Sequence, residues 1–471
     1  MYRPGSRPFL IAFFFCCIAL LVAACGSSGT GSISGGGTTP FASPTPAGRT
    51  HTPTPGGNGN GNGNPGTVST TAPLPATQTN CPAQGRGRAA VLAPLALGGD
   101  QNIVYIVNQG PVDAPTLATL KRYDVTTGSK TEILNLPRTE ISEAQVSADG
   151  QWILFVAIAS GQAKLQLVRM DGQGLQTLYC ATPPSNGAST GSALHDAQWS
   201  SDQKLIVFDS YTGSGSGVYV MDTQNGSVQA DIFMSGTSID YPILTWLDTT
   251  RVYLLGPEID APSGALYLLD TGKGANQNPQ NLPVVVTPTN TFCWNSDSSY
   301  DGTQLYTAEC TTDPNPNGPG IGDQRGPSMI NARAATGGSP QTLFANANMA
   351  ITAVRAINKT TLLFLVENNS FTGNADTSNN GLWKVNTGGT GLTRLTSDGA
   401  GVSGGPSNFN MFSQYPWSNV SRDGNLYALQ HNSADGKTQS LLFGALDGGT
   451  PTTFASISDG TQLSIVGWTT M

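Results

Sequence analysis

One unit recurs along most of this chain: a short apolar strand, a turn rich in Ser, Asp and Gly, and then further strands. It is plainest at "VSADGQWILFVAI", which begins at Val146 and is followed by a second pair of strands around Asp171-Gly172. Apolar runs bounded by Asp-Gly and Asn-Gly turns predict antiparallel strands. Repetition at spacings of about 45 to 65 residues predicts a repeat architecture such as a propeller.

Six units carry the whole pattern. They begin near Val146, Trp199, Thr245, Ser298, Ala356 and Asn419. A seventh begins at Ile103 but lacks a first strand, and the C-terminal "LSIVGWT" (residues 463–469) resembles a first strand without a unit. A ring closed by both ends of the chain accounts for both features. We therefore expect an all-β, seven-bladed propeller over residues 89–471, closed by the C-terminal strand and without helices.

The units resemble the TolB-type, WD-like propeller repeat, in which a Ser-Pro-Asp-Gly turn precedes an Ile-x-Phe strand and an Asp-x-x-Gly turn follows. Residues 147–150 (SADG) and 421–424 (SRDG) keep everything except the proline, and residues 200–203 (SSDQ) also lose the glycine. The resemblance covers residues 103–468. It implies the propeller fold. Because family members include periplasmic binding scaffolds and domains appended to peptidases, it does not by itself assign an activity.

The first 25 residues have the features of a bacterial lipoprotein signal. Arg3 and Arg7 precede an uninterrupted apolar run over residues 9–24, which is shorter than the roughly 20 residues that span a bilayer. The run ends in "VAAC", which resembles the lipobox, whose cysteine becomes the lipidated first residue of the mature chain. We expect residues 1–24 to be a signal peptide and Cys25 to carry acyl chains, palmitate among them, that anchor the protein to a membrane. The alternative is an ordinary secretory signal or an N-terminal membrane anchor.

Residues 25–88 have the composition of a disordered tether. Gly, Ser, Thr, Pro and Asn dominate, as in "TPTPGGNGNGNGNPG", and large apolar residues are almost absent. Such a segment cannot bury enough surface to offset the entropy of ordering it. Its r.m.s. reach as a flexible coil is roughly 45 Å. We therefore expect a folded domain held at a membrane of the bacterial cell envelope, outside the cytoplasm.

Charge and cysteine content narrow the possibilities further. The formal net charge is −8, and nucleic-acid binding needs a basic surface, so a nucleic-acid partner is excluded. Beyond Cys25 the predicted mature chain has an even number of cysteines, which predicts two disulfides in an oxidising compartment. These are Cys81, Cys180, Cys293 and Cys310.

The pairing of these cysteines follows from a predicted hairpin. Cys293 lies eight residues before Asp301, and Cys310 lies eight residues after Gly302. A two-residue turn at Asp301-Gly302 would place the two cysteines directly opposite each other; a bulge in the first strand would shift the register by one. By elimination, Cys81 would pair with Cys180 at the end of the second blade's outer strand.

Strand direction predicts which face of the ring binds partners. Because strands alternate within a blade, first-to-second and third-to-fourth turns share one face, here called the tight-turn face, and all other connections share the long-loop face. The tight turns include Asp149-Gly150, Asp171-Gly172, Asn225-Gly226, Asp423-Gly424 and Asp447-Gly448. The long connections are residues 181–193, 256–264, 311–327, 368–380 and 397–414. Long loops on a rigid scaffold often bind partners. We therefore expect a protein or an envelope glycan on the long-loop face; solvated loops without a binding role are the alternative.

A few side chains are candidates for that role. His195 precedes a first strand at a blade junction, where it either ties loop to blade or contacts a ligand. Phe371, Phe409 and Phe412 are candidates for exposed rings that pack on a partner. Oxygen ligands on the 311–327 loop could hold Ca²⁺, although they lack the EF-hand spacing and a plain turn-rich loop is the favoured interpretation. These are Asp313, Asn315, Asn317 and Asp323.

No set of catalytic residues stands out in the sequence. The folded part contains two histidines, His195 and His431, neither in an H-E-x-x-H spacing, and two scattered histidines do not define a Ser-His-Asp arrangement. We expect a non-enzymatic scaffold without a cofactor. The alternatives are a propeller enzyme of the lyase, lactonase or quinone-dependent dehydrogenase type, with its site at the central channel, and a purely structural envelope spacer.

Overall fold

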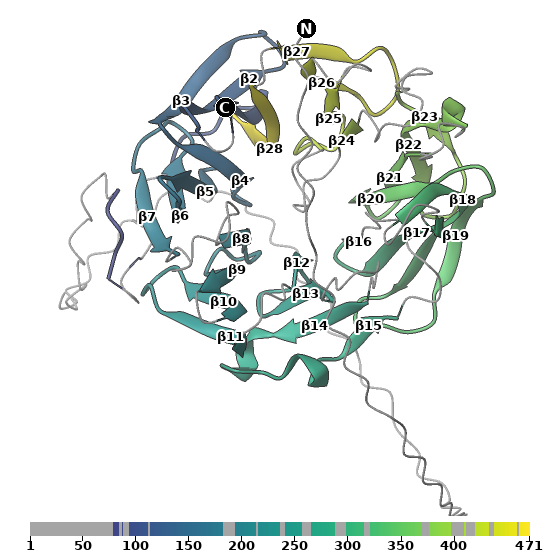
Figure 1. Ribbon diagram of the computed structural model, residues 1–471. Coiled ribbons are helices and arrows are strands. Elements are labelled where there is room, and N and C mark those ends of the chain that lie inside the picture. Colours follow the sequence, from purple (N-terminus) through teal and green to yellow (C-terminus); the bar gives the residue numbers. More distant parts are fainter. Residues whose placement is uncertain are drawn as a thin grey trace, which may run out of the picture. The chain divides into compact units, whose positions relative to one another are not determined.

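The computed structural model describes most of the chain beyond Asn80 (Figure 1). The described residues are 79–83, 87, 94–111, 114–181, 194–212, 215–235, 241–256, 265–287, 298–314, 321–368, 376–396, 409–410, 420–432, 438–458 and 461–471. All of them belong to the unit Thr70–Met471. The predicted signal peptide, Cys25 and most of the predicted tether lie outside this part.

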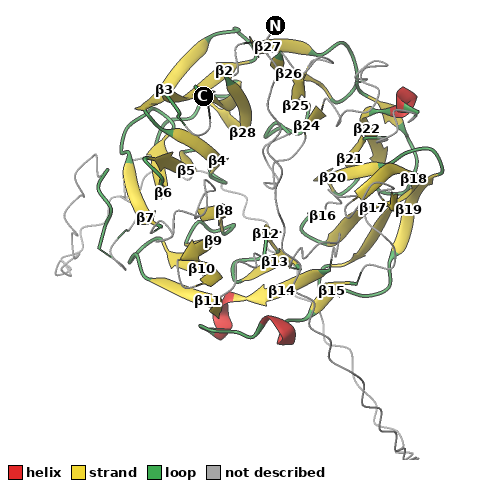
Figure 2. Ribbon diagram, in the orientation of Figure 1, coloured by secondary structure: helices red, strands yellow, loops and turns green. Residues whose placement is uncertain are grey.

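Seven four-stranded antiparallel sheets follow one another around a ring, which confirms the predicted propeller (Figures 1 and 2). Blade 1 consists of β28 (Gln462–Thr470), β1 (Gln101–Gln109), β2 (Leu117–Asp124) and β3 (Lys130–Pro137). Blade 2 consists of β4 (Glu140–Val146), β5 (Trp152–Ala159), β6 (Gln162–Arg169) and β7 (Gln176–Cys180). Blade 3 consists of β8 (Leu194–Trp199), β9 (Leu205–Thr212), β10 (Gly215–Asp222) and β11 (Val228–Ser235).

The other four blades repeat this order. Blade 4 consists of β12 (Ile243–Trp246), β13 (Arg251–Leu255), β14 (Leu266–Asp270) and β15 (Val284–Val286). Blade 5 consists of β16 (Ser298–Tyr300), β17 (Gln304–Pro314), β18 (Ile321–Ala334) and β19 (Gln341–Asn346). Blade 6 consists of β20 (Ile351–Asn358), β21 (Thr361–Val366), β22 (Gly381–Asn386) and β23 (Thr393–Arg394). Blade 7 consists of β24 (Phe409–Asn410), β25 (Leu426–Asn432), β26 (Gln439–Ala445) and β27 (Thr452–Ile457).

Helix is nearly absent from the described ranges. It is limited to three single turns of 3-10 helix: η1 (Thr271–Lys273), η2 (Pro279–Asn281) and η3 (Thr377–Asn379). Within these ranges no helix has the length and apolar character needed to cross a membrane.

The ring closes through the C-terminal strand, as predicted. β28 pairs antiparallel with β1, and Ile103 lies opposite Trp468. Both side chains are fully buried. Burial of large apolar side chains stabilises a fold by about 1.5–3 kcal/mol each, so the pairing of the two ends of the domain is held by packing as well as by the backbone ladder.

The core lies between neighbouring blades. Strand residues alternate between the two faces of each sheet, and each face packs against the next blade. Val104 and Ile106 of blade 1 share a cluster with Ile153 and Phe155 of blade 2. Further clusters of this kind fill the interfaces around the ring.

The repeated Ser-x-Asp turn has a structural function. In blade 2 the Ser147 hydroxyl donates to Asp149 Oδ1 (2.6 Å) and accepts from the backbone N–H of Trp152 (2.9 Å). The same Ser-to-Asp bond closes the turn in two other blades: Ser200–Asp202 (2.8 Å) and Ser421–Asp423 (2.5 Å). The motif therefore shapes the join between first and second strands, which explains why it specifies the fold and no chemistry.

Strand order confirms the face assigned to the predicted turns and to the connections 181–193, 256–264, 311–327 and 368–380. The fifth predicted connection, 397–414, was drawn too long, because it includes the first strand β24 and residues 411–414 of the next connection, on the tight-turn face. Two further segments reduce the difference in connection length between the two faces. Residues 271–283 join β14 to β15, and residues 411–425 join β24 to β25, so the tight-turn face also carries long connections.

Blade 5 corrects two expectations. Tyr300 pairs with Leu305, so four residues separate the paired positions at the turn that contains Asp301. The predicted two-residue turn is therefore wrong, and the strand register differs from the predicted register by two residues. The cause is the Asp301 carboxylate, which accepts from the backbone N–H groups of Thr303 and Gln304 (both 2.7 Å) and needs a four-residue turn to reach them. The register that was to place Cys293 opposite Cys310 is therefore not the observed one.

The second correction concerns the predicted loop at residues 311–327. β17 and β18 continue into it as a paired hairpin, with Thr311 opposite Arg325 and Pro314 opposite Ile321. Asp313 and Asp323 thus belong to strands, and Asn315 and Asn317 lie outside the described residues. The favoured interpretation of this segment was a plain turn-rich loop, with a calcium loop as the alternative. The structure replaces the plain loop by strand over most of its length.

Candidate functional site

His195 lies at a blade junction, as expected, against a partner that the sequence did not indicate. It is the second residue of β8, and its Nδ1 lies 3.7 Å from Glu143 Oε1 on β4 of the preceding blade. The imidazole is 42% exposed and the Glu143 carboxylate 25%. The pair therefore links the first strands of blades 2 and 3 while remaining accessible to solvent.

The neighbouring carboxylates set the charge of His195. Burial lowers its pKa, but the negative charges of Glu143, Asp196 and Asp209 outweigh burial and raise the pKa to about 9. The imidazole is therefore a cation throughout the neutral range. Asp196 has a positive φ of 54° and accepts a hydrogen bond from the N–H of Ile243 on blade 4 (3.0 Å), so this junction extends over three blades.

The predicted disulfide between Cys81 and Cys180 is present, with 5.8 Å between the two Cα atoms. It fastens the segment before β1 to the long-loop end of β7. The segment then passes along β7: a Cβ on Gly87 would lie 1.8 Å from the carbonyl oxygen of Leu178. Cys293 lies outside the described residues and only the backbone of Cys310 is described, so their pairing stays a prediction.

The base of the 368–380 connection is a built structure. The Asn380 side chain binds the backbone of Asn368 twice: its Oδ1 accepts from the Asn368 N–H (2.8 Å), and its Nδ2 donates to the Asn368 carbonyl (3.0 Å). Asn368 also accepts from the N–H of Ala350 and donates to the carbonyl of Asp376 (both 2.7 Å). Both asparagines are buried. The segment they close, residues 369–375, includes the candidate Phe371 and lies outside the described residues.

The other two aromatic candidates are only partly placed. Phe409 is the first residue of β24 and its backbone pairs with His431, while its side chain is not among those described. Phe412 lies outside the described residues. The role of the three phenylalanines on the long-loop face therefore stays a prediction.

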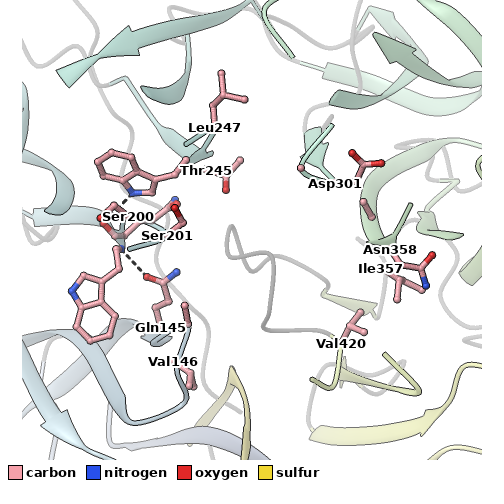
Figure 3. Close-up of a pocket in the computed structure, with 16 residues that line it drawn as sticks. Gln145, Val146, Ser200, Ser201, Thr245, Leu247, Asp301, Ile357, Asn358 and Val420 are labelled. Carbon is pink, nitrogen blue, oxygen red and sulfur yellow. Dashed lines mark hydrogen bonds between the residues drawn. The ribbon is translucent and has the colours of Figure 1, made fainter. Parts of the chain in front are cut away.

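A cavity that sequence reasoning missed lies at the mouth of the central channel on the tight-turn face. Its volume is about 350 Å³, and it is lined by the ends of first strands and the turns that follow them. Figure 3 shows Gln145, Ser200, Thr245 and Leu247 along one wall, opposite Asp301, Asn358 and Val420. These seven residues come from six blades, which is why no single stretch of sequence marks the cavity.

Hydrogen bonds between blades hold one wall of this cavity in place. Gln145 Oε1 accepts from the backbone N–H of Trp199 (3.0 Å), and Gln198 donates to the carbonyls of Ile243 and Leu244 (2.9 and 3.0 Å). The signal available in the sequence is the pair of residues before each Ser-x-Asp turn. Gln145-Val146 and Gln198-Trp199 occupy that position in blades 2 and 3, and both pairs line the cavity.

No metal centre is evident in the described part of the chain, where no three His, Cys, Asp or Glu side chains come together as ligands. The carboxylate at the cavity rim, Asp301, is held as an anion. Burial raises its pKa, but hydrogen bonds from Thr303 and Gln304 outweigh burial and hold the pKa below its usual value.

Part of the chain is similar to a known family of propellers. Residues 67–229 match the family model described as the lipoprotein LpqB β-propeller domain. These residues extend through blades 1 and 2 into blade 3 and include two of the Ser-x-Asp turns. The chain is a seven-bladed β-propeller protein whose first blades are similar to that family. Comparison with curated proteins gives no match.

The chain also has a low similarity to several solved structures. TolB from Acinetobacter baumannii is 16% identical, with a TM-score of 0.40 over 62% of this chain and 63% of that one. An uncharacterized Listeria monocytogenes protein is 13% identical, with a TM-score of 0.43 over 75% and 96%. The propeller domain of the Trilobed protease from Pyrococcus furiosus is 8% identical, with a TM-score of 0.46 over 82% and 97%. At these identities the likeness is one of fold alone.

Proposed function

We propose that this propeller is a lipid-anchored scaffold of the bacterial cell envelope that binds a protein or an envelope glycan through its long-loop face. The observation that carries the proposal is the backbone topology. The connections 181–193, 256–264 and 367–380 all leave the ring on that face. In blades 2, 3 and 6 the opposite strand ends are joined by turns of a few residues, whereas in blade 4 the opposite connection, 271–283, is also long. Long connections on a rigid ring provide a large surface without disturbing the core.

The family match supports the location. The matching family model describes a lipoprotein, and the sequence before the propeller has a lipobox-like cysteine at Cys25 followed by a long Gly-, Ser- and Pro-rich segment. A lipid anchor joined to a flexible segment lets a scaffold reach partners within a few tens of ångströms of a bilayer.

We propose no catalytic step at either site. The His195 imidazole is engaged by Glu143 and stays protonated at neutral pH, so it is poorly suited to act as a general base. The cavity on the tight-turn face is lined mainly by apolar and amide side chains. A propeller enzyme with its site at the channel is the second candidate, and a stoichiometric transition metal in the purified protein would favour it.

The anchor is tested with Cys25→Ser, which removes the acyl site. We expect the variant to leave the membrane fraction, or to accumulate with its signal peptide attached, while the parent protein remains membrane-bound. Cys81→Ser with Cys180→Ser is the control, because it removes two cysteines from the folded part and leaves the acyl site intact. A Cys25→Ser variant that is processed and fractionates with membranes like the parent would show that no lipid is attached there.

The binding face is tested by exchanging residues 369–375 for a Gly-Ser segment of equal length. Asn368 and Asn380 are kept because they close the base of the connection. We expect the free energy of unfolding of the variant to lie within about 1 kcal/mol of the parent value, as is usual for surface exchanges. We expect the variant to capture at least tenfold less partner from envelope extract. The control exchanges the exposed Asp447 and Thr450 on the tight-turn face for serines and keeps Gly448 and Gly449, whose φ is positive. Equal losses from both variants would remove the case for a long-loop binding face.

A further inference from the structure

The cavity on the tight-turn face lies away from the proposed partner surface and has polar groups with unused hydrogen-bonding capacity. Gln145 Oε1 is occupied by the N–H of Trp199, while its Nε2 has no partner among the described residues and faces the space between the walls (Figure 3). The Thr245 and Ser201 hydroxyls likewise have no described partner. The Asn358 oxygen accepts from Thr360 (2.8 and 2.9 Å), which leaves its Nδ2 as a donor.

These groups are held in place by the fold. Gln145 is buried, and its position is fixed by the bond to the neighbouring blade. Thr245 lies on β12 between Leu244 and Trp246. The Leu244 carbonyl accepts from Gln198, and the Trp246 indole donates to the carbonyl of Gln198 (3.3 Å). Donors mounted on strands keep their geometry when a ligand enters, so little conformational entropy is lost on binding.

Charge excludes anionic ligands. The described lining contains one ionised side chain, Asp301, and no lysine or arginine. Arg422 reaches the rim, but its guanidinium donates to the carbonyls of Trp468, Ala148 and Ser147 (2.9, 2.5 and 2.7 Å). The chain as a whole has a net charge of −8. A phosphate or uronate would therefore meet a carboxylate without a free cation to neutralise it.

The volume of the cavity and its apolar lining narrow the class of ligand. Val146, Leu247, Ile357 and Val420 add aliphatic surface between the polar groups. A volume of about 350 Å³ falls at the lower end of small-molecule pockets, about 300–1,000 Å³, and is too small to bury the surface of a protein partner. A ligand whose hydroxyl groups both donate and accept, with C–H faces between them, would match this mixture of amide, hydroxyl and aliphatic groups.

We propose that the channel mouth on the tight-turn face binds a neutral mono- or disaccharide unit. The site is independent of the long-loop face, so each can fail without the other. Gln145 Nε2, Thr245 and Asn358 donate to sugar hydroxyl oxygens, and Asp301 accepts from a hydroxyl at the opposite wall.

The experiment is calorimetric titration of the full-length chain in a detergent without a sugar headgroup. The probes are N,N′-diacetylchitobiose and maltose, with digalacturonate as the anionic counterpart and acetyl-tetraglycine amide as a neutral peptide. We expect saturable binding of at least one neutral disaccharide and none of digalacturonate. Gln145→Glu keeps the acceptor for Trp199 and removes the donor; it and Thr245→Val should each weaken binding about tenfold, the equivalent of one hydrogen bond.

Thr131→Val is the matched control, because Thr131 is exposed on the outer strand β3; it should bind like the parent. The proposal is wrong if neither neutral disaccharide binds a chain that melts cooperatively, or if binding survives both cavity substitutions. Binding of digalacturonate with similar affinity, or of the peptide in place of the sugars with the same sensitivity to Thr245→Val, would overturn the ligand class.

Discussion

Gln203 closes the Ser-x-Asp turn of blade 3 in a backbone conformation that favours glycine. Its φ is 58°, where the equivalent Gly150 and Gly424 have φ of 75° and 72°. The hydrogen bonds of the turn persist, with Ser200 Oγ donating to Asp202 and accepting from the N–H of Leu205. The serine and aspartate therefore determine the turn, and a glycine at the fourth position only lowers the conformational free energy of its positive φ.

Gln203→Gly should consequently stabilise the protein. A non-glycine residue in the left-handed region costs about 1–2 kcal/mol, and the extra freedom of glycine in the unfolded chain returns roughly 0.5–1 kcal/mol of that. We expect a net gain of about 0.5–1 kcal/mol in the free energy of unfolding, measured by denaturant melts. Gln224→Gly, in an exposed turn without a positive φ, should lower stability. A loss at Gln203 would show that its side chain has a role in the fold.

The candidate residues show what sequence could and could not establish at this scale. His195 was placed at a blade junction because it precedes a recognisable strand. Its partner Glu143 lies on another blade, and no local pattern connects the two. Gln145 is marked only by its place before a Ser-x-Asp turn, and Thr245 has no such mark, because the chemistry of both depends on neighbours from other blades.

At the scale of elements, strands and turn positions were predictable because the repeat spaces them regularly, whereas register was not. The turn at Asp301 has four residues because its carboxylate caps two backbone N–H groups. Asp-Gly alone predicts the shorter turn. Residues 311–327 were expected to be a loop because of their Asn, Pro and Gly content, yet cross-strand pairing extends through both arms.

The packing of β11 against the connection 271–283 contains a group sensitive to pH. Asp231 is fully buried, its Oδ1 accepts from Gln229 (2.5 Å), and its Oδ2 has no partner among the described atoms. Its backbone carbonyl accepts from the N–H of Gln277 (2.7 Å). Burial raises the pKa of Asp231 to about 6, the Gln229 bond opposes this, and the charge of Asp270 adds to it.

The sign of the pH effect follows from that shift. The folded state holds this proton more tightly than the unfolded chain, so stability falls as the pH rises from about 4 through 6. Asp231→Asn should reduce the loss between pH 4.5 and pH 7.5 by roughly 2 kcal/mol, measured by urea melts at both values. Asp447→Asn, in an exposed turn, should leave the difference unchanged. The same pH dependence in Asp231→Asn and the parent would contradict the assignment of this loss to Asp231.

At the scale of the whole molecule, the ring depends on contacts between distant parts of the chain. Arg422 in blade 7 binds the carbonyls of Trp468 in blade 1 and of Ser147 and Ala148 in blade 2. Thr469 donates to the carbonyl of Gly150 (2.9 Å). These bonds lie beside the β28–β1 pairing and connect three blades where the two ends of the domain meet.

Blade number and closure were predictable because the strand missing from the first unit reappears at the C-terminus. The channel-mouth cavity was not predictable, because the proposed loop face and the cavity lie on opposite faces and only the former shows as long connections in the sequence. The central claim is that partners bind the long-loop face.

Site-specific photo-crosslinking in intact cells tests this claim most directly. A photoreactive residue is placed at Ser160 or Arg138, exposed on the long-loop face, and at Thr126 or Gln224, exposed on the tight-turn face. We predict a discrete crosslinked product from at least one of the first two positions and none from the second two. The same product from Thr126 or Gln224, with none from Ser160 and Arg138, would contradict the proposed binding face.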